Sequence, residues 1–440
     1  MIESKLVRGL GRWDLVAIVI NTVIGAGIFG LPSKAYALIG PYSLVAIVIC
    51  GCIIGIIVLC YAEVASRFTT TGGPYLYAHE AFGTGTAFGV GWLSFVVRVT
   101  TQAANINLLV VYLGFLWPPA MGPSVRIVMI AAVLVGLFVV NFVGIRQAAV
   151  TTNLLTVGKL LPMIIFIAVG LFFVDPSRLS LGELPQYSSF SSAVLLLLYA
   201  FVGFESSVVA AGETKDPQRD FPFALLVGLG IIAAFYIFIL IVCIGTLPEL
   251  AASERPLADA ANLFMGPLGA GMIAVGAIIS ILGNLNTAVL AGSRIIYAMG
   301  ERRELPGVLA KTHTRFRTPY VSLAVISVCT FVFAINSSFI SAVAIATITR
   351  LLIYATTCLA LPVFRRRADM PKALFTAPLG VGAAVLSLGL IAWLLTNVDF
   401  AKEGIGIIIA LALGLILYVC SGLFGRFTEE ETLGPEQPKE

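Results

Sequence analysis

The stretch Ile24-Gly25-Ala26-Gly27-Ile28-Phe29 lies in the middle of an apolar run that extends from Asp14 to Ile39. Glycine costs about 1 kcal/mol in a helix interior, so two glycines two residues apart mark a place where a helix can open. A second such place, Tyr199-Ala200-Phe201-Val202-Gly203-Phe204-Glu205, lies within the run from Phe190 to Gly212. The alternative interpretation is close packing of helices through small residues.

The composition identifies the solvent of most of the chain. Of its 440 residues, 59% are hydrophobic and 11% are charged, and the mean hydropathy is +1.01. Because an ordinary soluble protein is about 25% charged, these values exclude a cytosolic globule, a secreted disulfide scaffold and a disordered chain. One membrane span takes roughly 20 apolar residues, so the length accommodates about a dozen spans and no large soluble domain.

Polar residues, prolines and glycines divide the chain into twelve apolar runs. The runs cover residues 14–39, 42–66, 85–117, 125–143, 152–174, 190–212, 223–246, 267–299, 321–335, 339–364, 378–396 and 405–424. Runs of this length and apolarity are typical of transmembrane helices. The sequence therefore predicts an all-α integral membrane protein with twelve transmembrane helices.

The positions of the basic residues predict the orientation. If the amino terminus is cytoplasmic, the outer loops hold only Lys34, Arg126, Arg178, Arg255 and Lys402, and the spans hold Arg98, Lys159, Arg294 and Arg350. The other 18 of the 27 basic residues then lie on the inner side. Short cytoplasmic loops are enriched in lysine and arginine, so we expect a multi-pass protein of the cell membrane with both termini in the cytoplasm.

The two glycine sites occupy matching positions in the chain. The first and sixth runs each begin a group of five helices, in residues 14–174 and 190–364, and the two groups enter the membrane from opposite sides. Broken helices at corresponding positions of inverted repeats indicate a transporter binding site. We expect a 5+5 inverted repeat with helices 1 and 6 broken. Residues 1–13 form a cytoplasmic amino terminus, 373–424 two additional helices and 425–440 a cytoplasmic tail.

Several motifs resemble those of the amino acid–polyamine–organocation (APC) family of secondary transporters. Within this family, they resemble the amino acid permeases. They cover roughly the first 310 residues, in the family's order and spacing. The motifs are residues 24–29, Tyr61-Ala62-Glu63 with residues 72–77 and 82–83, residues 199–205 with 212–213 and 216–222, and Arg294 with Leu305-Pro306. The resemblance implies the 5+5 fold with two further helices, alternating access, and amino acid or amine substrates.

The chemistry of an opened helix agrees with a zwitterionic substrate. The start of the second half exposes amide N–H groups, and a helix amino terminus attracts anions. We therefore expect Gly25, Ala26 and Gly27 to hold an α-carboxylate. The first half of the sixth helix ends in free carbonyls before Gly203, and these suit an α-ammonium group. They belong to Tyr199, Ala200 and Phe201.

Two ionisable residues at membrane depth are candidates for coupling, since charges there are rare and usually functional. Lys159 lies about 15 Å inside the fifth span and matches a lysine that, in sodium-independent family members, stands where sodium sits in sodium-coupled relatives. It either couples or gates transport, or bridges two spans. Glu205 senses protons, contacts a substrate amine or holds the unwound segment together. We expect sodium-independent uptake, with proton coupling as a hypothesis.

Arg98 is unusual for the family, near the middle of the third span. Ser94 and Gln102 are four residues before and after it, which places all three on one helical face, and the resemblance implies that this face lines the substrate pocket. Arg98 either pairs with Glu205 or contacts an acidic or carbonyl-bearing substrate, because arginine offers two parallel donors to a carboxylate. Both alternatives disfavour a strongly cationic substrate, so we expect a neutral or acidic amino acid.

Three further side chains are candidates for the pocket. Tyr199 matches the aromatic lid that family members carry over the substrate. Asn284 and Thr287 on the eighth span are either pocket residues or polar contacts between helices.

Other function classes have less support in the sequence. No HExxH segment, paired carboxylates within spans or Ser/His/Asp set indicates a membrane enzyme, and a channel is a second remote alternative. The seven cysteines lie in apolar runs and the two histidines are far apart, so we expect neither a metal nor a cofactor. The expected partners are an amino acid substrate, protons and the lipid bilayer, with no nucleic acid. An obligate exchanger is the alternative to a proton-coupled transporter, and a partner subunit is not indicated.

Overall fold

The computed structural model describes residues 10–70, 72–143, 148–398 and 404–432, and these are mostly helical. Parts of the expected termini, residues 1–9 and 433–440, lie outside the described residues. The α-helices of the first half are α1 (Arg12–Val23), α2 (Ala26–Ile39), α3 (Ser43–Ala65), α4 (Gly73–Phe82), α5 (Thr84–Leu116), α6 (Pro123–Val143) and α7 (Ala148–Gly170). Those of the second half are α8 (Tyr187–Phe201), α9 (Pro217–Thr246), α10 (Pro256–Glu301), α11 (Tyr320–Asn336), α12 (Phe339–Arg366), α13 (Val381–Thr396) and α14 (Ile405–Thr432).

Short 3-10 helices occupy several connections. They are η1 (Gly40–Tyr42), η2 (Pro118–Met121), η3 (Leu171–Phe173), η4 (Pro176–Leu179), η5 (Phe204–Glu213), η6 (Leu250–Ala252) and η7 (Gly307–Ala310). One of them, η5, replaces the second part of the expected sixth span.

Both glycine sites interrupt their helices. α1 ends at Val23 and α2 begins at Ala26, because Ile24 (ψ 94°) and Gly25 (φ −125°, ψ −145°) leave the helical region. α8 ends at Phe201, and Gly203 adopts φ 120° before η5 begins. A positive φ of this kind is accessible mainly to glycine, so the residue type itself permits the second break.

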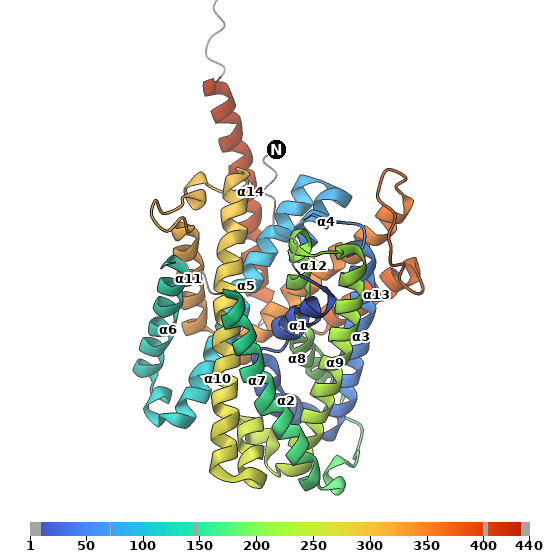
Figure 1. Ribbon diagram of the computed structural model, residues 1–440, viewed down its shortest axis with the longest axis vertical. Coiled ribbons are helices and arrows are strands. Elements are labelled where there is room, and N and C mark those ends of the chain that lie inside the picture. Colours follow the sequence, from blue (N-terminus) through green and yellow to red (C-terminus); the bar gives the residue numbers. More distant parts are fainter. Residues whose placement is uncertain (1–9, 71, 144–147, 399–403, 433–440) are drawn as a thin grey trace, which may run out of the picture.

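The two interruptions are packed against each other. A Cβ atom on Gly203 would lie 2.5 Å from the carbonyl oxygen of Thr22, and one on Gly27 would lie 3.0 Å from Cα of Ala200. Only glycine allows backbones to approach so closely. The broken segments therefore form one structural unit in the middle of the bundle, where Figure 1 shows α1 and α8 surrounded by the longer helices.

The helices are suited to a lipid environment. Within the described residues, seven segments are long and apolar enough to cross a membrane, and four shorter apolar helices accompany them. Large apolar side chains on the outer helices are exposed, as Val128 and Val135 on α6 and Leu415 on α14 illustrate. α10 bends at Gly266 (φ 65°), just before the expected eighth run. The count of twelve spans and the inverted repeat stay predictions.

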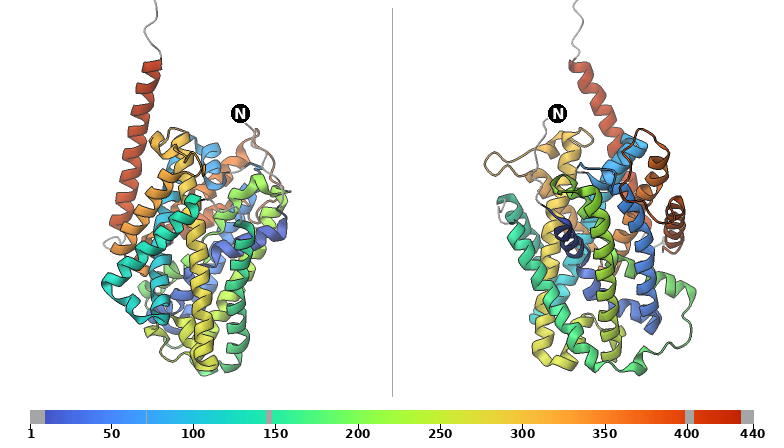
Figure 2. Two further views of the ribbon diagram at one scale, coloured as in Figure 1. Left: turned by 60° about the vertical axis from the view of Figure 1, so that its left-hand side comes forward. Right: turned by 45° about the vertical axis from the view of Figure 1, so that its right-hand side comes forward.

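Two long helices, α5 and α9, are each packed by several others. α10 and α12 lie against α5, whereas α3 and α1 lie against α9. α2 lies against α8. In the two views of Figure 2, α14 lies along one side and projects beyond the bundle, while α13 lies at another edge. α13 contacts α3 and α12, and α14 contacts α5 and α12.

A buried carboxylate fastens one end of the bundle. Glu63, near the end of α3, accepts two hydrogen bonds from Arg365 at 2.7 and 2.6 Å and one from Arg67 at 3.3 Å. The backbone N–H of Ala377 donates a fourth at 2.8 Å. The side chain of Glu63 has no exposed surface, so this carboxylate joins α3, α12 and the connection to α13.

We expect Glu63→Ala to lower the unfolding temperature of the purified protein. Removing one partner of a buried ion pair leaves an uncompensated charge and costs about 3–5 kcal/mol of folding free energy. Because Arg365 is partly exposed, we expect a loss of stability at the lower end of this range. The matched control is Asp369→Ala, which removes an exposed partner of Arg367 and should leave the unfolding temperature unchanged. Equal unfolding temperatures for the two variants would contradict this account of Glu63.

We expect Gly203→Ala to abolish folding or transport, because the new methyl group would meet the Thr22 carbonyl and the residue would be strained at φ 120°. The control is Gly230→Ala on α9, where a Cβ meets nothing within 4 Å. Size-exclusion chromatography of the detergent-purified variants measures folding, and uptake into liposomes measures activity. A fully active Gly203→Ala protein would show that the two backbones do not need this contact.

Candidate functional site

A cavity of about 650 Å³ lies between the two helix breaks and is bounded by α1, α2, α5, α8, η5, α10 and α12. It also reaches Gly72 and Tyr75 on the side of α4. Ten of the expected site residues line it: Gly25, Ala26, Gly27, Ser94, Arg98, Tyr199, Gly203, Glu205, Asn284 and Thr287. The remaining three binding candidates, Gln102, Ala200 and Phe201, are not among its lining residues.

Gln102 lies away from the cavity. Its side chain is fully buried, and its Oε1 accepts a hydrogen bond from Thr330 of α11 at 3.3 Å. Each step of four residues turns a helix by about 40° beyond a full turn, so Gln102 is rotated by about 80° from Ser94. That rotation takes it off the cavity and against α11.

At the end of α8, the carbonyls that we expected to bind an α-ammonium group are not all free. The Ala200 carbonyl accepts a hydrogen bond from the Tyr236 hydroxyl at 2.9 Å, so it is not free. Phe201 is fully buried and packs edge-on against the ring of Tyr236, with 5.2 Å between the ring centroids. Of the three residues, Tyr199 alone lines the cavity.

The amino terminus of α2 faces the cavity. Gly25, Ala26 and Gly27 are at its first turn, where the backbone N–H groups have no acceptor within the helix. Asn284 of α10 lies against Gly25, since a Cβ there would meet its Nδ2 at 2.9 Å, and its Oδ1 accepts from Asn105 at 3.0 Å. The absence of a side chain at Gly25 therefore leaves the polar amide of Asn284 beside the exposed backbone.

Lys159 fills the other side of the first break. Its Nζ donates to the carbonyls of Asn21 at 2.8 Å and Ile24 at 2.9 Å, and only 2% of the residue is exposed. These carbonyls belong to the end of α1, which carries the negative end of the helix dipole. A lysine on α7 thus supplies both the charge and the hydrogen bonds that the opened carbonyl end requires.

Glu205 stabilises the second break. Its Oε2 accepts from the backbone N–H of Gly203 at 3.0 Å and from the Tyr354 hydroxyl at 2.7 Å. Its Oε1 accepts from Nε of Arg350 at 3.1 Å. Arg350, which sequence analysis left among the in-span charges without a partner, is therefore the ion-pair partner of this carboxylate.

The expected pair between Arg98 and Glu205 is not formed. Arg98 instead donates from Nη2 to the hydroxyl of Ser206 at 2.7 Å. The carboxylate of Glu205 is already bound by Arg350, Tyr354 and the Gly203 amide, which use three of its about four acceptor positions. Arg98 is half-buried and lines the cavity next to them.

Sequence reasoning missed further lining residues, among them Asn21, Thr101, Asn105 and Ser206. Helical phase was a usable signal for one of them: Asn105 is seven residues after Arg98, which is a rotation of only about 20°. No such signal existed for Asn21, which lies in the last turn of α1, directly before the break. Its position beside the cavity depends on how α1 packs in the bundle.

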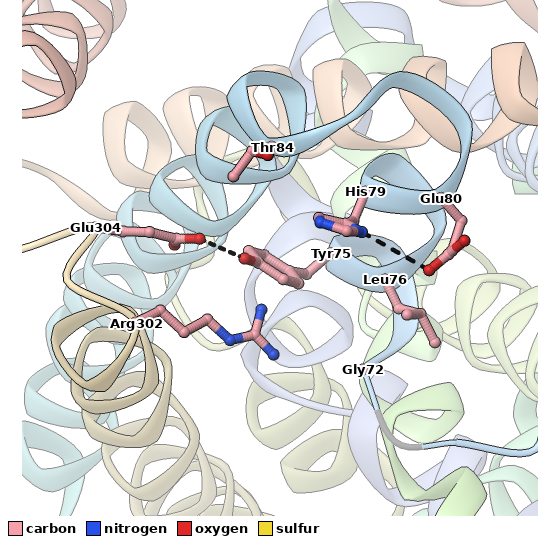
Figure 3. Close-up of a pocket in the computed structure, with 8 residues that line it drawn as sticks. All are labelled: Gly72, Tyr75, Leu76, His79, Glu80, Thr84, Arg302 and Glu304. Atoms are coloured by element: carbon pink, nitrogen blue, oxygen red, sulfur yellow. Dashed lines mark hydrogen bonds and ion pairs between the residues drawn. The ribbon is translucent and has the colours of Figure 1, made fainter. Parts of the chain in front are cut away.

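A second cavity of about 470 Å³ adjoins the first and shares Gly72, Tyr75 and Arg302 with it. Figure 3 shows Tyr75 between Glu304 and Arg302. The Tyr75 hydroxyl donates to Glu304 at 2.6 Å, and the Arg302 guanidinium lies 4.6 Å from the ring centroid of Tyr75. The two cavities together therefore extend toward α4 and the end of α10, which lie at the same end of the bundle (Figure 1).

The cavity offers amides, hydroxyls and arginines, which bind small polar molecules. Within the described ranges, no three His, Cys, Asp or Glu side chains are grouped to hold a metal ion.

Comparison with known proteins agrees with the motifs. A family model described as amino acid permease matches residues 10–419. The chain is 28% identical to the serine/threonine exchanger SteT of Bacillus subtilis, with 94% of this chain and 97% of that protein covered. It is 30% identical to an uncharacterized transporter of Mycobacterium tuberculosis, covering 89% and 92%. It is 26% identical to the branched-chain amino acid permease BcaP of Bacillus subtilis, covering 73% of each chain.

These relatives are transporters and permeases, and the apolar helices indicate a multi-pass membrane protein. With a family match over nearly its whole length, the chain belongs to the amino acid permeases of the APC family.

Proposed function

We propose that this protein is a sodium-independent secondary transporter that moves a neutral or acidic amino acid across the cell membrane by alternating access. The observation that carries the proposal is the pair of opened helices at one cavity. At the first opening the amide end faces the cavity, while Lys159 occupies the carbonyl end. The family match supports amino acid transport in general.

The proposed binding mode places the substrate backbone between the breaks. The free N–H groups at Gly25, Ala26 and Gly27 bind the α-carboxylate, helped by the positive end of the α2 dipole. The α-ammonium group faces the end of α8, where Tyr199 and Val202 line the cavity. Asn284 and Thr287 contribute polar groups from α10. Tyr199 closes over the bound substrate as a lid.

Lys159 is proposed to replace a sodium ion. An ammonium group held by two carbonyls of α1 supplies one positive charge at the place where the broken helix needs it. A change in its protonation alters the charge at the break, and we propose that proton coupling acts there. In this proposal, the Lys159 ammonium group occupies the place of sodium at the α1 carbonyls, so transport does not require a sodium ion.

The cavity is proposed to be open toward the cytoplasm. It adjoins a second cavity at Tyr75 and Arg302, and the basic residues predict that this end of the bundle is the inner one. Both termini then lie in the cytoplasm, and the structure corresponds to an inward-facing state.

Obligate exchange is the second candidate mechanism. One relative is named a serine/threonine exchanger and another a putative arginine/ornithine antiporter of Bacillus subtilis. Both names favour coupled movement of two amino acids in opposite directions, although their substrates differ.

Uptake of radiolabelled amino acids into liposomes containing the purified protein tests the function. We expect saturable uptake that is unchanged when sodium is replaced by choline. The pH gradient and the internal amino acid are varied independently: a proton-coupled transporter responds to the first, and an obligate exchanger works only with the second. A requirement for sodium would contradict the proposal, and absence of uptake or counterflow of every amino acid class would refute amino acid transport.

We expect Lys159→Ala to reduce the initial uptake rate at least about tenfold and to flatten its dependence on pH. The change removes two hydrogen bonds and a buried charge at the α1 carbonyls, and loss of a charged hydrogen bond at a buried acceptor costs about 1.5–3 kcal/mol. The measurement is initial rate from pH 5 to 8, with Lys311→Ala on an exposed loop as control. A variant that keeps the full pH dependence would exclude Lys159 as the coupling residue.

A further inference from the structure

We infer that the preferred substrate is an acidic amino acid, whose side-chain carboxylate is bound by Arg98 with Arg350 beside it. This inference rests on the proposed function and narrows its substrate class. The charged side chains that line the cavity, and the hydrogen bonds that they make within the protein, support it.

The Glu205 carboxylate is largely occupied by protein groups. One oxygen is bound by the Gly203 amide and the Tyr354 hydroxyl, and the other by Arg350 at 3.1 Å, which fills three of about four acceptor positions. Only 8% of Glu205 is exposed. A substrate ammonium group on a long side chain would compete with Arg350 for this carboxylate, and displacing Arg350 would leave a buried arginine without its counterion.

Arg98 has no carboxylate of its own. Within the described residues its hydrogen bond is to the neutral hydroxyl of Ser206, and no ion pair joins it to an acidic side chain within 4.0 Å. It lies within electrostatic range of both Glu205 and Arg350, so one negative charge is shared by two guanidinium groups. The local group carries one excess positive charge at a cavity in a medium of low dielectric constant.

Arg350 adds an unused donor to the same group. It lines the cavity, only 3% of it is exposed, and its Nη1 has no hydrogen-bond partner. A buried donor without an acceptor costs about 1–3 kcal/mol, and more when the group is charged. An anion that binds in the cavity also neutralises the charge of this group, and it can accept the two parallel N–H groups of a guanidinium such as that of Arg98.

The rest of the cavity has the same sign of charge. Four arginines line it, namely Arg98, Arg294, Arg302 and Arg350, whereas Glu205 is the single acidic lining residue in the described part of the chain. Arg294 and Arg302 lie at the carboxyl-terminal end of α10, and like-signed charges along a cleft raise the local concentration of an oppositely charged ligand. A substrate with net charge −1 is complementary to this lining, and a cationic one is repelled.

The carboxylate site is separate from the backbone site. The free amides of α2 lie beside Asn284 of α10, whereas Arg98 comes from α5 and contacts η5. A cavity of about 650 Å³ has room for a ligand that contacts both. The predicted substrate therefore carries two carboxylates, one on the backbone and one on the side chain, as glutamate and aspartate do.

The test compares glutamate with glutamine, which differ in charge and hardly in size. In liposomes containing the full-length protein, we expect L-glutamate to compete with labelled substrate at a concentration at least about tenfold lower than L-glutamine, and arginine to compete least. Arg98→Gln should raise the concentration required for glutamate at least about tenfold and change that for glutamine less than threefold. Arg98→Lys should retain part of the preference, since it keeps the charge but loses the fork.

The control is Arg219→Gln, which removes an exposed arginine that does not line the cavity and should keep the wild-type preference. Should Arg98→Gln fail to fold, the wild-type protein still decides: glutamate must raise its unfolding temperature more than glutamine does. Equal competition by glutamate and glutamine, or stronger competition by arginine, overturns the inference while leaving amino acid transport intact. Absence of competition by any amino acid overturns the proposed function as well.

Discussion

The contact between the two broken helices is the constraint on which the structure depends. In a membrane, an unpaired backbone group has no water to bond to and must find a partner within the protein. Here each opened end has one: Lys159 binds the carbonyls of Asn21 and Ile24, Tyr236 binds that of Ala200, and Glu205 accepts from the Gly203 amide. The amide end of α2 is the exception, and it faces the cavity. Helices α7 and α9 therefore each supply a partner to an opened helix end, and α12 supplies partners to Glu205. In the described part of the chain, the amide end of α2 is the proposed binding site.

The charges in the cavity follow from the same rule. A buried carboxylate that holds a helix break needs a counterion, and Arg350 provides it from α12, with the Tyr354 hydroxyl on the same helix. A second arginine, Arg98, lies near this carboxylate, which already accepts three hydrogen bonds, and it donates to Ser206 instead. An excess positive charge at a water-accessible cavity is tolerable, whereas the same charge facing lipid would be costly. The arrangement that stabilises the broken helix is thus also the one from which we infer the charge of the ligand.

Sequence reasoning was most successful where a residue acts through its backbone. Glycines at 25, 27 and 203 predicted both interruptions, because their effect on the chain is local and depends on no distant partner. It was less successful with side chains that need a partner. The pairing of Arg98 with Glu205 was a reasonable expectation from charge alone, but Arg350, 145 residues away in sequence, takes that place. Gln102 lies away from the cavity for a geometric reason. Each step of four residues rotates the side chain further around the helix axis, and two such steps place Gln102 against α11.

The amino acid sequence by itself determined the solvent, the family and the positions of the two breaks, because hydropathy, motif order and glycine spacing are properties of the linear chain. Only the tertiary structure decided which charges meet. It brought Lys159 to the end of α1, joined Glu205 to Arg350 and left Arg98 without a carboxylate. The physical reason is that an ion pair within a few ångströms is decided by the packing and rotation of whole helices, and a shift of one residue in helical phase changes the partner.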